Sequence, residues 1–116
     1  MRLKSGFWIL AYIRTCAQAN CAAYVVRHGD DDAGAAFIKI NHLDGTASLY
    51  GPAPAGMSEA IDAQRFAVLI GPDAARSESD VDAYVAKQYE YDPDLWLIEV
   101  EDAKRRHFLD DWLATD

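Results

Sequence analysis

Two glutamates near the end of the chain have the spacing of a carboxylate pair that could do chemistry. Glu99 and Glu101 lie two residues apart in the stretch LWLIEVE, residues 95–101. On a β-strand they point to the same side, about 6.6 Å apart along the strand. Such a pair could serve two-carboxylate glycoside hydrolysis or bind a divalent cation. Alternation of polar positions on a half-buried strand also explains them and, as the default pattern of such strands, is the interpretation we favour. The opposite, core face would be formed by Trp96, Ile98 and Val100.

The other reactive residue types do not form a recognised constellation. Cys16 and Cys21 are too few for a disulfide framework and lack the CxxC spacing. The three histidines His28, His42 and His107 have no metal-ligand spacing with them. A nucleophile-elbow motif and a phosphate-binding glycine loop are also missing from the sequence. We therefore assign no catalytic residue, no metal site and no cofactor.

Length and charge restrict the class of protein. The chain has 116 residues, of which 51% are hydrophobic and 26% charged, as expected for a single globular domain spanning residues 1–116. Its formal net charge is −8, and the lysines and arginines are scattered. The longest basic run, residues 104–106, is flanked by Asp102 and Asp110. Because nucleic-acid affinity rests on a basic surface, this pattern argues against a nucleic-acid partner.

The first 21 residues allow two interpretations. A charged start, the apolar run GFWILAYI and the later AQA could mark a signal peptide. Arg14 interrupts the apolar run, which is also far too short to cross a bilayer. We therefore expect a buried first helix, a cytoplasmic protein and no membrane association.

The first half of the chain predicts a helix followed by three strands. The helix would begin at a Ser5 cap and end near Asn20, with a buried stripe at Ile9, Ile13, Cys16 and Ala17. A strand over 21–28 and a hairpin over 35–51 would follow. Asp44-Gly45 predicts a two-residue turn, which pairs Lys39 with Tyr50. That register gives a core face of Ile38, Ile40, Ala47 and Leu49. It gives a polar face of Lys39, Asn41, Ser48 and Tyr50.

The second half predicts a further strand, a helix and a final strand. A Pro- and Gly-bearing connection covers 51–64, and residues 65–72 favour a short fourth strand, with a helical turn as the alternative. Ser77 or Ser79 would cap a helix that Pro93 ends. The strand over 95–101 could then pair with residues 106–109 as a hairpin. The expected fold is α+β, with two helices on a mixed or mostly antiparallel sheet of four to six strands, in the order α-β-β-β-(β)-α-β-(β).

Several segments, taken in order, carry a resemblance. They are RLKSGFW near the start, RHGDDDAG and IKINHLDGTASLYGPAP in the middle, and YDPDLWLIEVED and RHFLD near the end. Together they resemble the short bacterial proteins of domain-of-unknown-function family 1491. The resemblance implies a small bacterial protein and supplies no activity or site. It also leads us to expect a glycine in the last turn, where this chain has residues 103–105 as Ala-Lys-Arg, which argues against a tight turn there.

Two functional hypotheses remain open. The first is a non-catalytic protein-interaction or regulatory module with an unknown protein partner, and a homodimer formed through an exposed edge strand is one form of it. The second is a small enzyme, or a protein that binds a metal or small molecule, acting through the Glu99 and Glu101 face. A concave site lined by these glutamates would favour the second hypothesis. The residues assigned to the binding surface are Lys39, Tyr50, Glu99, Glu101 and Arg106.

Overall fold

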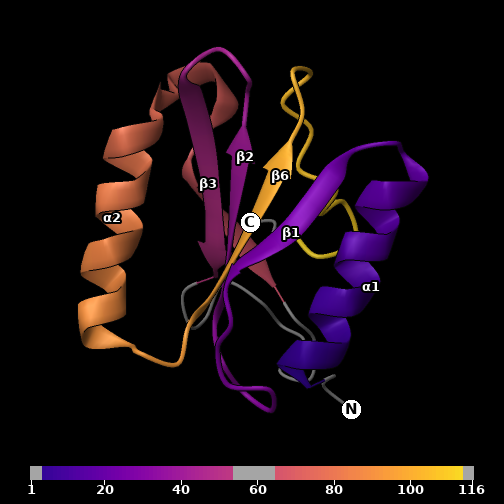
Figure 1. The fold of residues 1–116 in the computed structure, drawn as a ribbon, viewed down its shortest axis with the longest axis vertical. Coiled ribbons are helices and arrows are strands. Elements are labelled where there is room, and N and C mark those ends of the chain that lie inside the picture. Colours follow the sequence, from indigo (N-terminus) through magenta and orange to yellow (C-terminus); the bar gives the residue numbers. More distant parts are fainter. Residues whose placement is uncertain (1–3, 54–64, 114–116) are drawn as a thin grey trace.

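The protein is a central sheet with one helix on each side, seen in a computed structural model that describes residues 4–53 and 65–113 (Figure 1). The elements are α1 (Ser5–Gln18), β1 (Ala22–Arg27), β2 (Ala36–Asn41), β3 (Thr46–Pro52), β4 (Phe66–Ile70), a 3-10 turn η1 (Pro72–Ala74), β5 (Arg76–Ser77), α2 (Glu78–Tyr91) and β6 (Trp96–Glu101). Most of the connection predicted over 51–64 lies outside the described residues.

The last strand of the chain lies in the middle of the sheet. The strand order is β1-β6-β2-β3-β4, and the short β5 also pairs with β3. β6 runs parallel to β2 and antiparallel to β1, whereas β2, β3 and β4 form antiparallel neighbours. The predicted α+β class, its mixed sheet and its element order are therefore confirmed.

Helix α1 forms as predicted, but its ends differ in detail. Ser5 is not its cap, because its hydroxyl donates instead to the Gly34 carbonyl at 2.7 Å. The loop after β1 takes over that role, since the N–H of Gly6 donates to the Asp31 carbonyl at 2.9 Å. At the other end Asn20 adopts a left-handed φ of 60°, which allows the N–H of Cys21 to donate to the Cys16 carbonyl at 3.0 Å.

The buried face of α1 is centred on aromatic residues. Its most buried apolar members are Trp8, Ile9, Tyr12 and Cys16, whereas the predicted Ala17 is exposed. The Trp8 ring stacks on Phe66 of β4, with ring centroids 4.8 Å apart. These contacts hold α1 across one face of the sheet. A second cluster under α2 includes Leu49, Val81, Val85 and Leu97 and fills the other face. No helix within residues 4–53 and 65–113 has the length and apolarity needed to cross a membrane.

The predicted register of the β2–β3 hairpin is wrong by one residue. Lys39 pairs with Leu49, and Tyr50 pairs with Ile38. The connection has three residues rather than two, because Leu43 takes a φ of 64° in addition to Gly45 at 90°. Side chains flanking the loop supply hydrogen bonds that suit this conformation: Asn41 Oδ1 accepts from the N–H of Leu43 at 2.8 Å. This one-residue difference in register places Tyr50 on the α1 face of the sheet and Lys39 on the α2 face.

The segment after β6 also departs from expectation. A tight turn does form without glycine, because the N–H of Arg105 donates to the Asp102 carbonyl at 2.9 Å and Arg105 takes a φ of 63°. The hairpin predicted for residues 106–109 is wrong. Both edges of β6 are already occupied, by β1 on one side and β2 on the other.

Candidate functional site

The two glutamates lie on the α2 face of β6, as the alternation of that strand predicts. Strand β1 pairs Tyr24 with Glu99, and strand β2 pairs Lys39 with Glu99 from the other side. The Tyr24 hydroxyl oxygen lies 2.9 Å from Glu99 Oε2 and 3.1 Å from Glu101 Oε2. A single phenol therefore bridges the carboxylate pair that the sequence singled out.

Lys39 lies at the centre of this cluster and is almost completely buried. Its ammonium is 3.0 Å from Glu78 Oε1, 2.9 Å from Asp82 Oδ1 and 3.2 Å from Glu99 Oε1. Asn41 Nδ2 also donates to Glu78 Oε1 at 3.0 Å. An ammonium has three N–H donors, so three carboxylate acceptors satisfy it. We call Lys39, Asn41, Glu78, Asp82 and Glu99 the Lys39 cluster.

The electrostatics of the cluster hold both partners in their charged forms. Burial would lower the pKa of Lys39, but hydrogen bonds to Asp82 and Glu78 more than offset it, so its pKa is raised. Burial would raise the pKa of Glu99, and hydrogen bonds from Asn41 and Tyr24 together with the Lys39 charge lower it overall. Burial of its hydroxyl and hydrogen bonding to Glu99 raise the pKa of Tyr24.

These shifts oppose catalysis at this cluster. A lysine nucleophile or base needs a lowered pKa, whereas Lys39 is kept protonated. A general acid needs a raised carboxyl pKa, whereas Glu99 is kept ionised. Within residues 4–53 and 65–113, no group of three or more acidic, His or Cys side chains is arranged to hold a metal ion. The cluster ties α2 to the sheet.

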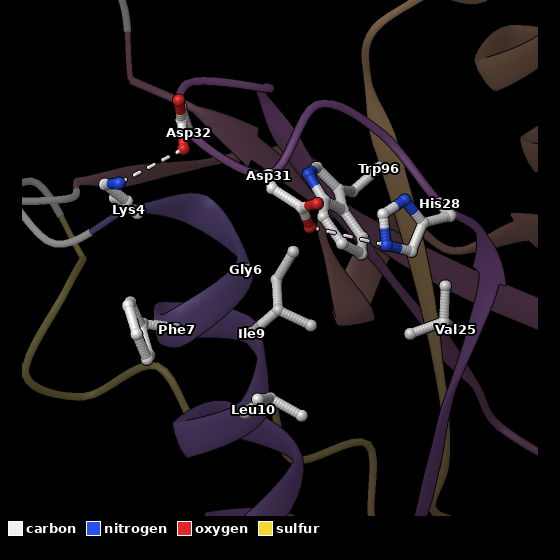
Figure 2. A pocket seen from close by; sticks show the side chains of 10 residues that line it. All are labelled: Lys4, Gly6, Phe7, Ile9, Leu10, Val25, His28, Asp31, Asp32 and Trp96. Carbon is white, nitrogen blue, oxygen red and sulfur yellow. Dashed lines mark ion pairs between the residues drawn. The ribbon is translucent and has the colours of Figure 1, made fainter.

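A pocket of about 350 Å³ lies on the opposite face, between α1 and β1 (Figure 2). Phe7, Ile9 and Leu10 of α1 form one side, and Val25 of β1 with Trp96 of β6 form the other. We call this the α1–β1 pocket. Phe7 and Leu10 are strongly exposed, whereas Ile9 and Trp96 are buried and form its base. The pocket therefore has a fixed apolar floor and an open apolar mouth.

Charged residues occupy one rim of the α1–β1 pocket. His28 Nε2 lies 3.4 Å from Asp31 Oδ1, and Lys4 Nζ lies 3.5 Å from Asp32 Oδ1 (Figure 2). All four side chains are largely exposed. Both contacts are longer than a charge-assisted hydrogen bond, which spans about 2.7–2.9 Å. The two carboxylates therefore remain available to a further donor.

The loop that carries this rim is held in place by hydrogen bonds and close packing. Trp96 Nε1 donates to the Asp30 carbonyl at 2.8 Å. The His28 ring packs on the Trp96 ring, with centroids 4.0 Å apart. A Cβ added at Gly29 would clash with the Asp94 carbonyl, so only glycine allows this approach. The rim is thus fixed relative to the floor.

Strand β1 borders the α1–β1 pocket and forms an edge of the sheet. Within the described part of the chain it pairs with β6 alone. Tyr24, Val25 and Val26 are all exposed, and the register shifts between Val25 and Arg27, which indicates a bulge at Val26. Residues 22–25, before this bulge, leave a regular edge unpaired.

Comparison with known proteins identifies the family. Residues 3–110 match the family described as "Protein of unknown function (DUF1491)". The chain belongs to the DUF1491 family. Its description gives no activity, and no curated protein matches this DUF1491 chain.

Solved structures of relatives share the fold of this DUF1491 chain. A crystal structure of a DUF1491 family protein from Caulobacter crescentus CB15 is 32% identical, with a TM-score of 0.76, over 99% of this chain and 100% of that one. An NMR structure of a DUF1491 family protein from the same organism is 33% identical, with a TM-score of 0.77, over 99% of both chains. A solution structure from A. tumefaciens is 32% identical, with a TM-score of 0.74, over 87% of this chain and 86% of that one.

Three of the five binding residues predicted for this DUF1491 chain lie together and two do not. Lys39 contacts Glu99, and the Tyr24 hydroxyl links Glu99 to Glu101. Tyr50 is buried on the other face of the sheet, with its ring centroid 5.2 Å from that of His107.

The fifth predicted residue, Arg106, forms an ion pair after β6. Its Nε donates to Asp102 Oδ2 at 2.8 Å, and its Nη2 lies 3.3 Å from Cys21 Sγ. Asp102 itself is buried, so this pair neutralises a carboxylate that the turn has taken out of water. Neither Glu99 nor Glu101 lines the α1–β1 pocket.

Sequence reasoning missed both the partners of Lys39 and the α1–β1 pocket. Glu78 and Asp82 are one helical turn apart at the start of α2, which is a signal for a shared helix face. Phe7 and Leu10 lie off the buried stripe of α1, and large apolar residues there indicate an exposed apolar face. Tyr24 gave no local signal, because its role depends on β1 pairing with β6.

Proposed function

We propose that this protein is a non-catalytic interaction module that binds an extended segment of a partner protein along the outer edge of β1. The observation that carries the proposal is the unpaired edge of residues 22–25, which lies beside the exposed apolar mouth of the α1–β1 pocket. In strand addition, backbone hydrogen bonds supply affinity and pockets for alternate side chains supply specificity. Here the unpaired backbone of β1 and the α1–β1 pocket lie next to each other.

The exposed apolar surface supports the same proposal. Phe7 and Leu10 on α1 and Tyr24, Val25 and Val26 on β1 make up five of the nine large hydrophobic side chains that are exposed in the described residues. They come from α1 and the edge strand β1, which lie next to each other (Figure 1), with Tyr24 on the α2 face of the sheet and the α1–β1 pocket on the other face. Exposed apolar residues that gather in one place mark interaction sites more often than scattered ones do.

Charge suggests the chemistry of the partner. On the pocket side of β1 lie Asp31 and Asp32, paired at long distance with His28 and Lys4, and on the other face lie Glu99 and Glu101 around Tyr24. The whole chain has a formal charge of −8. A strand laid along β1 would therefore place its side chains near carboxylates on both faces, which favours a partner segment with basic residues.

The carboxylates that suggested chemistry do not support an enzyme equally well. Lys39 and Glu99 satisfy each other and the start of α2. Their pKa values are shifted away from those that general acid–base or nucleophilic work requires. A structural role accounts for all of their contacts.

The test uses a matched pair of variants on the two edges of the sheet. Val26 of β1 and Val68 of β4 are 51% and 52% exposed, so lysine can replace either without disturbing the core. A lysine on an edge strand discourages pairing and repels a basic segment. The probe is a short capped peptide of alternating apolar and lysine residues, with a control in which alternate residues are proline.

We expect NMR titration to shift the β1 amide signals of wild-type protein with the alternating peptide and not with the proline control. Val26→Lys should weaken binding about tenfold, and Val68→Lys should leave it within about twofold of wild type. Equal weakening by both variants would contradict the proposal. So would a concentration-dependent dimer abolished by Val26→Lys alone, because a second copy would then be the occupant of the edge.

A further inference from the structure

We infer that the α1–β1 pocket receives one large apolar side chain of the partner segment, and that Asp31 selects an arginine two residues away from it. This inference rests on the proposed function and names the side chains that the segment must carry. Its basis is the juxtaposition of an apolar pocket, a fixed acidic rim and an unpaired strand edge within one small region.

The size and lining of the pocket fit a single side chain. Its volume of about 350 Å³ is near the lower end of the range for small-molecule sites, which run from about 300 to 1,000 Å³. Its walls are apolar, from Phe7, Ile9, Leu10, Val25 and Trp96. An aromatic or long aliphatic side chain fits this space, and an exposed mouth next to a strand edge suits a side chain that arrives on a backbone.

The pocket is also preorganised. Its floor residues Ile9 and Trp96 are buried, and the Trp96 indole is fixed by its hydrogen bond to the Asp30 carbonyl. The N–H of Gly6 donates to the Asp31 carbonyl and sets the distance between α1 and the rim. A site that is already ordered loses little conformational entropy when it is filled.

The position of Asp31 explains the second side chain. Its carboxylate lies over Gly6 at the mouth of the pocket, where a Cβ on Gly6 would be 3.1 Å from Asp31 Oδ1 (Figure 2). Its ion-pair partner is His28, at 3.4 Å, and the carboxylate is 73% exposed. A planar guanidinium can bind such an exposed carboxylate through two parallel hydrogen bonds.

Strand geometry sets the spacing of the two side chains. In an extended segment, residues i and i+2 point to the same face and lie about 6.6–6.8 Å apart. β1 runs from Ala22 towards the loop that carries Asp31. If the apolar residue enters the pocket beside Val25, a residue two positions closer to that loop points towards the same rim. The partner pattern is thus one apolar residue and one arginine separated by a single residue.

The test compares three capped peptides on a common extended background. The first carries phenylalanine and arginine with one residue between them, the second replaces phenylalanine by alanine, and the third replaces arginine by glutamine. We expect the loss of phenylalanine to weaken binding about tenfold and the loss of arginine to weaken it about threefold to tenfold. The first peptide should also shift the Trp96 indole N–H signal, which the alanine peptide should not.

A charge-matched pair of variants identifies the arginine contact. Asp31→Asn should bind the arginine and glutamine peptides with equal affinity, whereas Asp110→Asn should keep the preference of wild type. Both changes remove one negative charge from an exposed aspartate, and both leave the backbone contact of Asp31 intact.

The possible results distinguish a failure of the phenylalanine and arginine assignment from a failure of strand addition to β1. Equal binding of all three peptides, with shifts in the β1 amides, would overturn the inference and leave strand addition standing. A preference for arginine that survives in Asp31→Asn would overturn the assignment of Asp31. Absence of binding by all three peptides would overturn both, because the alternating pattern itself would then have no affinity for β1.

Discussion

Replacing Lys39 by methionine should destabilise the fold strongly, and the size of the loss follows from its surroundings. Methionine keeps most of the apolar stem but removes the cation that faces Glu78, Asp82 and Glu99. Removing one partner of a buried ion pair costs about 3–5 kcal/mol, because the other charge is left buried without compensation.

Differences in exposure among the carboxylates place this variant at the lower end of that range. Glu99 is only 14% exposed, whereas Glu78 and Asp82 are 38% and 57% exposed and can turn to water. We therefore expect Lys39→Met to lower the free energy of unfolding by about 3 kcal/mol near pH 7. As a control, Lys87→Met lies at an exposed position of α2, the helix that carries Glu78 and Asp82. It should change the free energy of unfolding by less than about 0.5 kcal/mol.

The loss should depend on pH in a defined direction. In the wild type the pKa of Glu99 is lowered, so its contribution to stability is present above the unfolded carboxyl pKa of about 4.3 and is lost as the pH falls through its folded value. In Lys39→Met, ionisation of the buried Glu99 carboxyl no longer stabilises the folded state. The difference between wild type and Lys39→Met should therefore shrink as the pH falls below about 4.

Urea unfolding followed by tryptophan fluorescence measures these differences. Adding Glu99→Gln to Lys39→Met should recover part of the lost stability near neutral pH, because it removes the charge left without a partner. A loss below about 1 kcal/mol in Lys39→Met, or a loss that grows as the pH falls, would refute the reasoning.

Two further predictions concern Gly34, which packs against Asp94 just before β6, and Arg106, which follows β6. Gly34→Ala should destabilise the protein by about 2 kcal/mol in urea unfolding, because its Cβ would lie 2.5 Å from the Asp94 carbonyl. Gly71→Ala, whose Cβ meets its nearest neighbour at 3.4 Å, should be neutral or slightly stabilising, and equal losses in both would contradict the account. Arg106→Gln should destabilise the protein at neutral pH and less so in acid, since Arg106 lowers the pKa of Asp102 against the opposing effect of burial; a loss that does not depend on pH would count against this.

Local patterns in the sequence were sufficient for several elements. The alternation from Trp96 to Glu101 predicted that Trp96, Ile98 and Val100 share a core face of β6, with the glutamates on the opposite face. Ser77 or Ser79 was expected to cap α2, and the Ser77 hydroxyl accepts from the N–H of Asp80 at 3.2 Å. Both features depend only on residues that are close in sequence.

The errors arose where a distant contact or an unusual backbone angle decides the structure. The positive φ of Leu43 lengthened the hairpin loop and moved Tyr50 to the opposite face from Lys39. Insertion of β6 between β1 and β2 left no edge for residues 106–109. The sequence has no local signal for either event.

The candidate site on β1 could not be predicted for the same reason. It needs the exposed Phe7 and Leu10 of α1, the edge position of β1 and the rim that Asp31 forms over Gly6. Each residue is ordinary when taken alone. Only the folded arrangement brings an apolar mouth, an acidic rim and an unpaired strand together.

Amide hydrogen exchange across β1 tests the central claim most directly. It should be measured with and without the peptide that carries phenylalanine and arginine, for wild type, Val26→Lys and Val68→Lys. We predict slower exchange at residues 22–25 of wild type and of Val68→Lys, and in Val26→Lys the same slowing only at about tenfold higher peptide concentration. Unchanged exchange in β1 of the wild type at saturating peptide, or protection that appears at β4 instead, would contradict the claim that β1 is the docking edge.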